Sequence, residues 1–477
     1  MSKQSSRRDF FKKTATFAGA LAGARLLGVQ AVFADGLPSE KIRMVVIGCG
    51  GRGREAHIVP CMGEKLVAIV EPDPKNVAQV FNPKKDKNGK VEHQLDAGQV
   101  KVFTDYRKLF DEYHKEFDAV SVATTNQHHA TPALMGMKLG KHAYVEKPLC
   151  YTIAEARLMA EYSKKYKVAT QMGNQGHSGA AYRTLCEYIW AGAIGQVHTV
   201  YCWTDRSNGG VGPRPPTETP PAGMDWDSWI GPAPYRDYHK DLHPHEWHGW
   251  HDFGNGSLGN MACHVMDGAH WSLKLGAPTS IVVEEAGGGT EERYTTGTRI
   301  RWDFPARGEM GPVKLYWYDG KKKGLKTAEK GEYDDSVDPK AQNLPPLFHE
   351  LAKKYDRKFE GSGTLYVGDK GIMFTGCYGG GVRIIPEEQH KATPVPAQTI
   401  PRIKGTHYGD FLRGIRGGEP PCSNFEVASK LTELLLLGCL AIKAGVGKKL
   451  EWDGDKVTNL PEINKLLSRE PRKGWGI

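Results

Sequence analysis

The sequence predicts an α/β protein that begins with a doubly wound parallel sheet. A short apolar run at 41–47 breaks into glycine, as a buried strand does where it enters a phosphate-binding turn. From 41 to about 166, short apolar segments alternate with amphipathic ones, which is the βαβ order of a parallel sheet. Farther along, three segments alternate in the manner of strands, at 280–285, 298–304 and 313–318. We therefore expect a second domain with a sheet of its own.

The bulk composition sets limits on the class of protein. At 477 residues the chain is too long for a single hydrophobic core. The net charge is +9, but the basic residues are spread along the chain without a Lys/Arg block, so nucleic-acid binding is not favoured. Nine cysteines, an odd number without close repeated spacing, argue against a disulfide framework and a structural zinc site. An ordinary globular protein of two domains is expected.

An export signal is expected at the N-terminus. Residues 6–12 read SRRDFFK, a twin-arginine pattern, and a weakly apolar, Ala/Gly-rich segment follows at 14–34. Val32-Phe33-Ala34 suits the cleavage positions, so we assign 1–34 to a signal for the twin-arginine export machinery and expect a periplasmic product. Arg25 and the many glycines make the 14–34 segment unsuitable as a stable membrane anchor. A disordered basic tail is the alternative.

The first strand leads into a candidate dinucleotide site. Gly48, Gly50 and Gly53 fit the pattern G-x-G-x-x-G, in which the glycines allow a tight turn, close approach of a pyrophosphate and packing of a helix on the strand. Gly51 and Arg52 lie in the same turn, where the helix that opens there aims its free N–H groups at phosphates. A glycine-rich turn that merely ends a strand is the alternative.

The second strand, 66–70, strengthens that prediction. It ends on Glu71, with Asp73 close behind, at about the 20-residue separation from the first glycine that a ribose-hydroxyl ligand needs. A carboxylate there repels a 2′-phosphate, which favours NAD over NADP. Arg52 and Arg54 are placed to cradle a 2′-phosphate, and they keep NADP open as the alternative.

Two further strand ends carry polar side chains toward the same edge of the sheet. The strand at 119–123 runs into Thr124, Asn126 and His129, which face a nicotinamide ribose or only cap the helix that follows. The strand at 142–145 ends on Glu146-Lys147-Pro148. A lysine there that is partly desolvated has a lowered pKa and can exchange a proton with a hydroxyl. The alternative is a surface lysine in a turn.

The second domain contains a histidine-rich stretch at 239–253, after a Pro/Gly-rich loop at 209–234 that we expect over the pocket or an interface. The helical spacing H-E-x-x-H is not met, so the stretch does not favour a metal site. A polar, aromatic wall for a sugar ring is favoured instead, with Trp250 and His251 in it. A helix is predicted over 255–276, with Asn260, His264 and Asp267 on one face.

The motifs in order resemble a known family. The glycine turn from Gly48 to Gly53, Glu71, Glu146-Lys147-Pro148 and the segment 256–267, GSLGNMACHVMD, are together similar to the glucose-fructose oxidoreductase and inositol dehydrogenase (Gfo/Idh/MocA) family. The resemblance implies a homo-oligomer with three folded parts. These are a Rossmann domain at 41–166, an α/β substrate and oligomerisation domain with a large, mostly antiparallel open sheet at 167–402, and C-terminal helices at 403–477 that pack back on the first domain.

The resemblance also implies the chemistry. Members of the family mostly oxidise sugars, polyols or related hydroxyl compounds with NAD(P), and His264 would be the proton acceptor beside Lys147, with Asp267 orienting it or holding substrate. The family usually has an aspartate four residues before this histidine, where this chain has Asn260, and an amide cannot accept a proton. Asp267 then supplies the charge, or Lys147 does most of the acid–base work, or the site has drifted from dehydrogenase chemistry.

Three functions follow as hypotheses. The first is an exported NAD(P)-dependent oxidoreductase acting on a CH–OH group of a carbohydrate or polyol, with a retained cofactor because free dinucleotide is scarce outside the cytoplasm. The second is an NAD-dependent glycosidase or lyase that oxidises a sugar transiently, eliminates the glycosidic bond and reduces again. The third is a non-catalytic sugar-binding protein.

Overall fold

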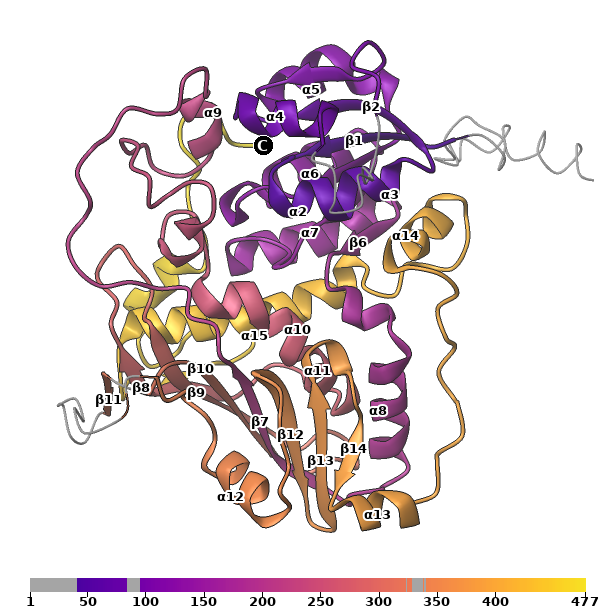
Figure 1. The fold of residues 1–477 in the computed structure, drawn as a ribbon, viewed down its shortest axis with the longest axis vertical. Helices are drawn as coiled ribbons and strands as arrows, with labels where there is room; N and C mark the ends of the chain where they lie inside the picture. The colour runs from indigo at the N-terminus through magenta and orange to yellow at the C-terminus, as the bar shows by residue number, and fades with distance from the viewer. Residues whose placement is uncertain (1–40, 84–94, 323, 328–337, 339) are drawn as a thin grey trace, which may run out of the picture. The chain divides into compact units, whose positions relative to one another are not determined.

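A computed structural model of the chain describes residues 41–83, 95–322, 324–327, 338 and 340–477. The expected export signal at 1–34 lies outside the described residues. The described part contains two sheets, one built from 43–172 and the other from strands between 197 and 451 (Figure 1). None of the described helices combines the length and the apolar character that a membrane crossing requires.

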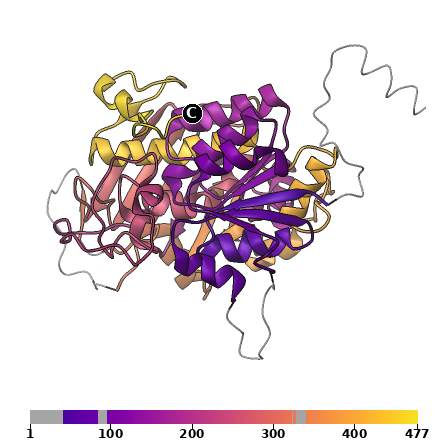
Figure 2. The ribbon, with the colours of Figure 1, turned by 90° about the horizontal axis from the view of Figure 1, so that it is seen from above.

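The first sheet is parallel throughout, with strand order β3-β2-β1-β4-β5-β6. Its strands are β1 (Arg43–Ile47), β2 (Lys65–Val70), β3 (Lys101–Phe103), β4 (Ala119–Val122), β5 (His142–Val145) and β6 (Thr170–Met172). Seen from above, helices lie on both sides of the strands (Figure 2). The helical segments of this part are α2 (Gly51–Gly53), η1 (Arg54–Ile58), α3 (Val59–Cys61), α4 (Pro74–Phe81), α5 (Tyr106–Tyr113), η2 (His114–Glu116), η3 (Asn126–His128), α6 (Ala130–Lys138) and α7 (Ile153–Tyr166). The prediction of a doubly wound sheet is confirmed.

Burial on both faces explains why these strands are continuous apolar runs. In β1, Val45 and Ile47 belong to the core cluster on one face, and Met44 and Val46 to the cluster on the other. This alternation is what a strand covered by helices on both sides requires. A polar substitution at any of these four positions would place an unpaired group inside a core.

The second sheet has nine strands and is mostly antiparallel, in the order β11-β8-β9-β10-β7-β12-β13-β14, with β15 pairing β8. One pair, β7 with β10, is parallel. The strands are β7 (Val197–Thr204), β8 (Ser280–Gly287), β9 (Gly297–Phe304), β10 (Val313–Gly320), β11 (Leu325–Thr327), β12 (Ser362–Gly368), β13 (Gly371–Gly376), β14 (Arg383–Ile385) and β15 (Leu450–Glu451). Outside 255–276, the helical segments of this part are α8 (Ala180–Trp190), α9 (Trp226–Ile230), α12 (Pro346–Lys354), α13 (Glu387–Ala392), α14 (His407–Ile415), α15 (Phe425–Ala444) and the short turns η4 (Gln175–Ser178), η5 (Glu246–Gly249), η7 (Cys377–Gly379) and η8 (Pro461–Leu466). The three strands expected between 280 and 318 are confirmed.

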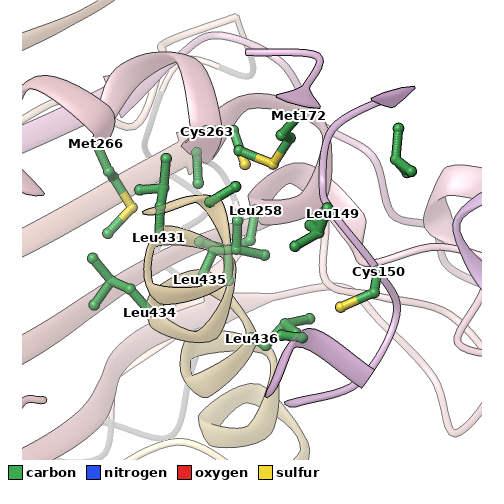
Figure 3. Close-up of a cluster of buried hydrophobic side chains, with 14 of the residues drawn as sticks. Leu149, Cys150, Met172, Leu258, Cys263, Met266, Leu431, Leu434, Leu435 and Leu436 are labelled. Carbon is green, nitrogen blue, oxygen red and sulfur yellow. The ribbon is translucent and has the colours of Figure 1, made fainter. Parts of the chain in front are cut away.

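Helix α15 joins the two halves. It contacts α7 and β6 of the parallel-sheet half and β8 of the second sheet. Leu431, Leu434 and Leu435 point from it into a buried cluster that also holds Leu258 and Leu149 (Figure 3). The helix begins cleanly because the Asn424 side chain accepts hydrogen bonds from the first free N–H groups, those of residues 426 and 427.

The prediction of one continuous helix over 255–276 is wrong. The segment instead contains a π-helical turn, η6 (Leu258–Ala262), followed by the short helices α10 (Cys263–Val265) and α11 (Asp267–Ser272). A π turn holds more residues than an α turn, so it changes which side chains share a face. Asn260 and His264 line a cavity together, whereas Asp267 faces elsewhere.

A long segment, 205–253, leaves β7 and folds beside the parallel sheet, with α9 near α4 and α5 (Figure 1). It has its own aromatic core, in which Trp226 and Trp229 stack at 4.5 Å between ring centroids. Two bonds fix it to the loop after β2. The Asp225 N–H donates to the carbonyl of Pro72, and the His243 ring nitrogen Nε2 lies 2.7 Å from the Asp73 carboxylate.

Truncation of Leu435 tests the role of α15. This side chain is fully buried, so Leu435→Ala leaves a cavity between the two halves and should lower the free energy of unfolding by about 2–5 kcal/mol. Urea denaturation followed by circular dichroism measures the loss. The matched control is Leu139→Ala, at a leucine that is 45% exposed, which should change stability by less than about 0.5 kcal/mol. Equal effects of the two variants would contradict this account of the core.

Candidate active site

A cavity of about 950 Å³ opens at the carboxyl ends of the strands of the parallel sheet. Its wall comes from the turns that follow β1, β2, β4 and β5, from the 205–253 segment, and from η6 and η7. The carboxyl edge of a doubly wound sheet is where such folds bind ligands. The predicted residues on this wall are Gly48, Gly50, Gly51, Arg52, Glu71, Asp73, Thr124, Asn126, His129, Glu146, Lys147, Asn260 and His264.

Two glycines of the turn are required by its packing, and two others leave their backbone open to the cavity. Gly48 has φ +87°, and a Cβ there would lie 2.6 Å from the carbonyl oxygen of Ala123. A Cβ on Gly53 would lie 2.0 Å from the carbonyl oxygen of Gly48, so this glycine lets the helix pack on the strand. A Cβ on Gly51, by contrast, would meet nothing within 4 Å, and both Gly50 and Gly51 line the cavity. The turn thus leaves open backbone at a helix start, which is the arrangement that receives phosphates.

The two carboxylates after β2 sit at the same end of the cavity. Glu71 accepts hydrogen bonds from the N–H groups of Cys49 (2.7 Å) and Asp73 (3.0 Å), which orient it toward the glycine turn. Burial raises the pKa of Glu71, although these two hydrogen bonds oppose that effect. Asp73 caps α4 through the N–H of Lys75 and contacts His243. Each carboxylate oxygen retains a lone pair for a ribose hydroxyl.

Arg52, a candidate ligand for a 2′-phosphate, is engaged through its Nε in this structure. Its Nε donates to Glu146 at 3.0 Å, and the neighbouring Arg54 donates to the Gln79 side chain. Glu146 also contacts His57 Nε2 at 3.2 Å and accepts from the N–H of Lys147 at 3.1 Å. Burial alone would raise the pKa of Glu146, but His57, Arg52 and Lys147 outweigh it and hold that pKa well below its usual range. Glu146 is therefore an anion that fixes the glycine turn to the lysine turn.

Lys147 reaches across to the second half of the molecule. Its Nζ donates to the backbone oxygen of Asn260 at 2.9 Å and to the side-chain Oδ1 of the same residue at 3.0 Å. The Asn260 amide nitrogen in turn donates to Asn208. Burial lowers the pKa of Lys147, and nearby Glu146 partly opposes the shift. Asn260 thus accepts two hydrogen bonds from the Lys147 ammonium, one at its backbone oxygen and one at its side-chain amide oxygen.

His264 lies in the same cavity wall. The ring is 4% exposed, and its Nδ1 has no hydrogen-bond partner among the described residues. Burial and then the charge of Lys147 lower the pKa of His264 well below its ordinary value, so the ring is neutral near pH 7. A neutral imidazole with a free nitrogen can accept a proton.

Asp267 does not contact His264, contrary to the expectation that it orients this ring. Its carboxylate instead pairs with His177 Nδ1 at 2.9 Å and accepts from the Asn174 amide at 3.0 Å. It is 1% exposed and does not line the cavity. The stretch is not one α-helix, because the π turn η6 and the break between α10 and α11 at Met266 interrupt the period that would place the three side chains on one face.

Thr124, Asn126 and His129 meet the cavity as expected, and the structure shows what holds two of them. The two ring nitrogens of His129 lie 2.7 Å from the carbonyl oxygen of Pro148 and 3.0 Å from that of Thr124. This ring therefore joins the turn after β5 to the turn after β4. The Asn126 amide donates to Asn255 at 2.9 Å, just before η6.

Trp250 and His251 do not line the cavity, so their expected role as its wall is wrong. Trp250 is fully buried between the guanidinium groups of Arg236 and Arg293, at 4.7 and 4.8 Å from the ring centroid. The His251 ring packs on Tyr294. The aromatic wall comes instead from other members of the 205–253 segment: Trp229, Tyr238, His243, Trp247 and His248. In an irregular loop, side-chain direction has no period that a sequence can reveal.

The cavity residues that the sequence did not predict as site residues include Gln175, Arg206 and Tyr378. Tyr378 has φ 60°, which is rare for a residue other than glycine. The signal was a cluster of glycines around it, from 376 to 381. Among the described residues, no group of three or more His, Cys, Asp or Glu side chains is arranged to hold a metal ion.

Comparison with known proteins places this geometry in context. Residues 42–174 match a family model described as "Oxidoreductase family, NAD-binding Rossmann fold", and 195–304 match one described as "Oxidoreductase family, C-terminal alpha/beta domain". Among curated relatives, the chain is 34% identical over 92 residues to a 1,5-anhydro-D-fructose reductase of Ensifer adhaerens, covering 18% of this chain and 28% of that one. It is 30% identical over 111 residues to an inositol 2-dehydrogenase of Salmonella typhimurium, covering 23% and 32%. It is 26% identical over 168 residues to a levoglucosan dehydrogenase of Pseudarthrobacter phenanthrenivorans, covering 35% of each. The chain thus spans about a third of the length of the curated relatives it matches.

Solved structures show the same fold at low identity. The WlbA dehydrogenase from Bordetella pertussis, in complex with NADH and UDP-GlcNAcA, superposes with a TM-score of 0.56 at 13% identity, over 87% of this chain and 99% of that one. GenD2 from gentamicin A biosynthesis, in complex with NAD, gives 0.51 at 14%, over 88% and 98%. The two family models, which match the parallel sheet and the first part of the second sheet in order, show that this chain belongs to the Gfo/Idh/MocA oxidoreductase family.

Proposed function

We propose that this protein oxidises a hydroxyl of a sugar, polyol or glycoside and passes the hydride to a nicotinamide dinucleotide. The observation that carries the proposal is the shared cavity. The glycine turn, Lys147 and His264 line one wall, and Lys147 is bonded to Asn260 in the turn just before His264. The named relatives act on 1,5-anhydro-D-fructose, inositol and levoglucosan, which are all polyhydroxylated rings.

The residues present fit such a cofactor. Open backbone at Gly50 and Gly51 would hold the pyrophosphate, and Glu71 with Asp73 would hold the adenosine ribose. Asn126 and His129 lie on the wall between that end and Lys147, where the nicotinamide ribose would sit. The carboxylates, together with the engagement of Arg52 by Glu146, support NAD over NADP. When bound, the nicotinamide supplies the hydride acceptor.

The side chains divide the proton chemistry between them. Neutral His264, which lines the cavity, accepts the hydroxyl proton at its imidazole ring. Lys147, held by the two oxygens of Asn260, donates a hydrogen bond to the same hydroxyl oxygen and stabilises the charge that develops there. Asn260 is neutral, so it positions the ammonium without raising its pKa as a carboxylate would.

Enclosure of the cofactor end supports a retained dinucleotide. The 205–253 segment covers the loop after β2, through the contacts of Pro72 with Asp225 and of Asp73 with His243. The C-terminal tail closes over this segment, since the N–H of Arg472 donates to Pro232 and Trp475 packs on Tyr106. Export through the twin-arginine route, expected for 1–34, carries folded proteins and is consistent with loading before export. Cell fractionation and light scattering test the periplasmic location and the expected homo-oligomer.

A redox-neutral glycosidase or lyase is the second candidate, and the same enclosure favours it. A hydride that stays on a retained dinucleotide can return to the same sugar after the glycosidic bond is eliminated. The two functions differ in their products. Net oxidation accumulates absorbance at 340 nm or needs a second substrate, whereas transient oxidation releases aglycone without net reduced cofactor.

Replacing Lys147 tests the proposed function directly. Lys147→Ala should lower kcat for reduction of the bound dinucleotide by about 10²–10⁴-fold, because the group that stabilises the hydroxyl oxygen is lost. Cofactor content, measured by absorbance after denaturation, should stay unchanged. The matched control is Lys138→Ala, at an exposed lysine of α6, which should keep full activity. If no sugar, polyol or glycoside reduces the cofactor and none releases aglycone, the proposed function is wrong.

The pH dependence tests the role of His264. Because burial holds the pKa of His264 below its ordinary value, the ring stays unprotonated from pH 8 down through pH 6.5. The rate kcat/KM should therefore stay level through this range and fall only when acidification protonates the ring. In His264→Gln the remaining activity should lose this acid limb. A normal histidine limb near pH 6.5 in the wild type would contradict the assignment.

Native mass spectrometry tests retention. The purified protein should carry a stoichiometric dinucleotide with the mass of NAD rather than NADP. His243→Ala breaks the contact with Asp73 and should speed loss of cofactor on dialysis, measured as the bound fraction over time. His198→Ala, at an exposed histidine of β7, is the control and should lose cofactor at the wild-type rate. Equal rates in all three proteins would exclude a closing role for the 205–253 segment.

A further inference from the structure

Arg206 is a cation on the cavity wall without a counter-ion. It lies just after β7, at the start of the 205–253 segment, and shares the wall with Asn260, His264 and Tyr378. Among the described residues, its guanidinium has no hydrogen bond and no carboxylate within 4.0 Å. Arg52, on the same wall, is by contrast already engaged by Glu146. An exposed guanidinium that faces a cavity is free to bind an anion from solution.

The charges of the wall make this end of the cavity positive. Three carboxylates line the cavity, and two of them, Glu71 and Asp73, belong to the cofactor end. The third, Glu146, is held by Arg52 and His57. The charge of Arg206 reaches the reacting groups, because it is among the influences that lower the pKa of both Lys147 and His264, after burial.

Tyr378 gives the same region a flat apolar face. Its ring lies 4.6 Å from the His264 ring, between centroids, and the residue remains 41% exposed. Its backbone is held in the left-handed region at φ 60°, which is unfavourable for a residue with a side chain. Aromatic faces pack against the C–H faces of sugar rings. The loop thus presents a ring-sized platform next to the proposed proton acceptor.

We propose that the substrate is an anionic sugar, a uronic acid or its glycoside, whose carboxylate binds Arg206 while its ring packs on Tyr378. This proposal rests on the proposed function and names its substrate class. The guanidinium fork matches a carboxylate in two parallel hydrogen bonds, which gives selectivity over a neutral hydroxymethyl group of the same size. The reacting hydroxyl then lies on the side of Lys147 and His264.

Calorimetric titration of the protein as purified, with its dinucleotide, tests the proposal without requiring turnover. The probes are matched pairs, methyl glucuronide with methyl glucoside and methyl galacturonide with methyl galactoside. In one configuration at least, the uronide should bind about tenfold or more tightly than its neutral partner. Arg206→Gln should abolish the difference, and Arg206→Lys should retain part of it. Arg383→Gln, at an exposed arginine outside the cavity, is the control and should leave the difference intact.

Several outcomes separate this proposal from its alternatives. Uronides that bind no more tightly than neutral sugars, or a preference that survives Arg206→Gln, would overturn it. A sugar phosphate that binds more tightly than the uronide through Arg206 would assign the site to phosphate esters and overturn the carboxylate. Neutral sugars that reduce the cofactor of the wild-type protein as well as their matched uronides do would leave the proposed function standing and overturn this proposal. Selective uronide binding that depends on Arg206, without any cofactor reduction or aglycone release, would keep the anion site and show that the proposed function is wrong.

Discussion

The contact between Lys147 and Asn260 is the interaction on which the site depends. It joins the turn after β5 in the parallel-sheet half to the π-helical turn η6 in the other half. Glu146 fixes the same lysine turn to Arg52 and the glycine turn, and His129 fixes it to the turn after β4. Four chain segments are thus joined at the turn Glu146-Lys147-Pro148. The core around α15 holds these segments in register, since Leu149 and Leu258 pack against the same leucines (Figure 3).

The sequence was sufficient to predict the parts of the fold in which apolar residues recur at a regular spacing. β1 is a buried apolar run that ends in glycine, and the alternation that follows could come only from strands and helices in turn. Gly48, Glu71 and Lys147 were found for the same reason, because each follows a strand end. Position along a regular element therefore carries most of the information that predicts this site.

The failures have physical causes of the same kind. Asp267 was placed beside His264 by the geometry of one continuous α-helix, but the segment contains a π turn at 258–262 and a break between α10 and α11 at Met266. Trp250 was placed on the cavity wall because an aromatic side chain suits sugar binding. In the structure it is buried in the aromatic core of the 205–253 segment. Tyr378 and Arg206 come from loops far from the motifs in sequence. Only the three-dimensional arrangement of the second sheet brings them to the cavity.

The contacts at the cofactor end bear on how small molecules would reach the cavity. The 205–253 segment is bonded to the loop after β2, whereas Arg206 and Tyr378 are exposed on another part of the cavity wall. Under the proposed function, this exposed side would admit both the compound that gives up a hydride and the compound that takes it back. An enzyme of this kind would alternate between the oxidised and the reduced cofactor and bind its two reactants in turn. Its double-reciprocal plots would run parallel, and either reactant in excess would block the other.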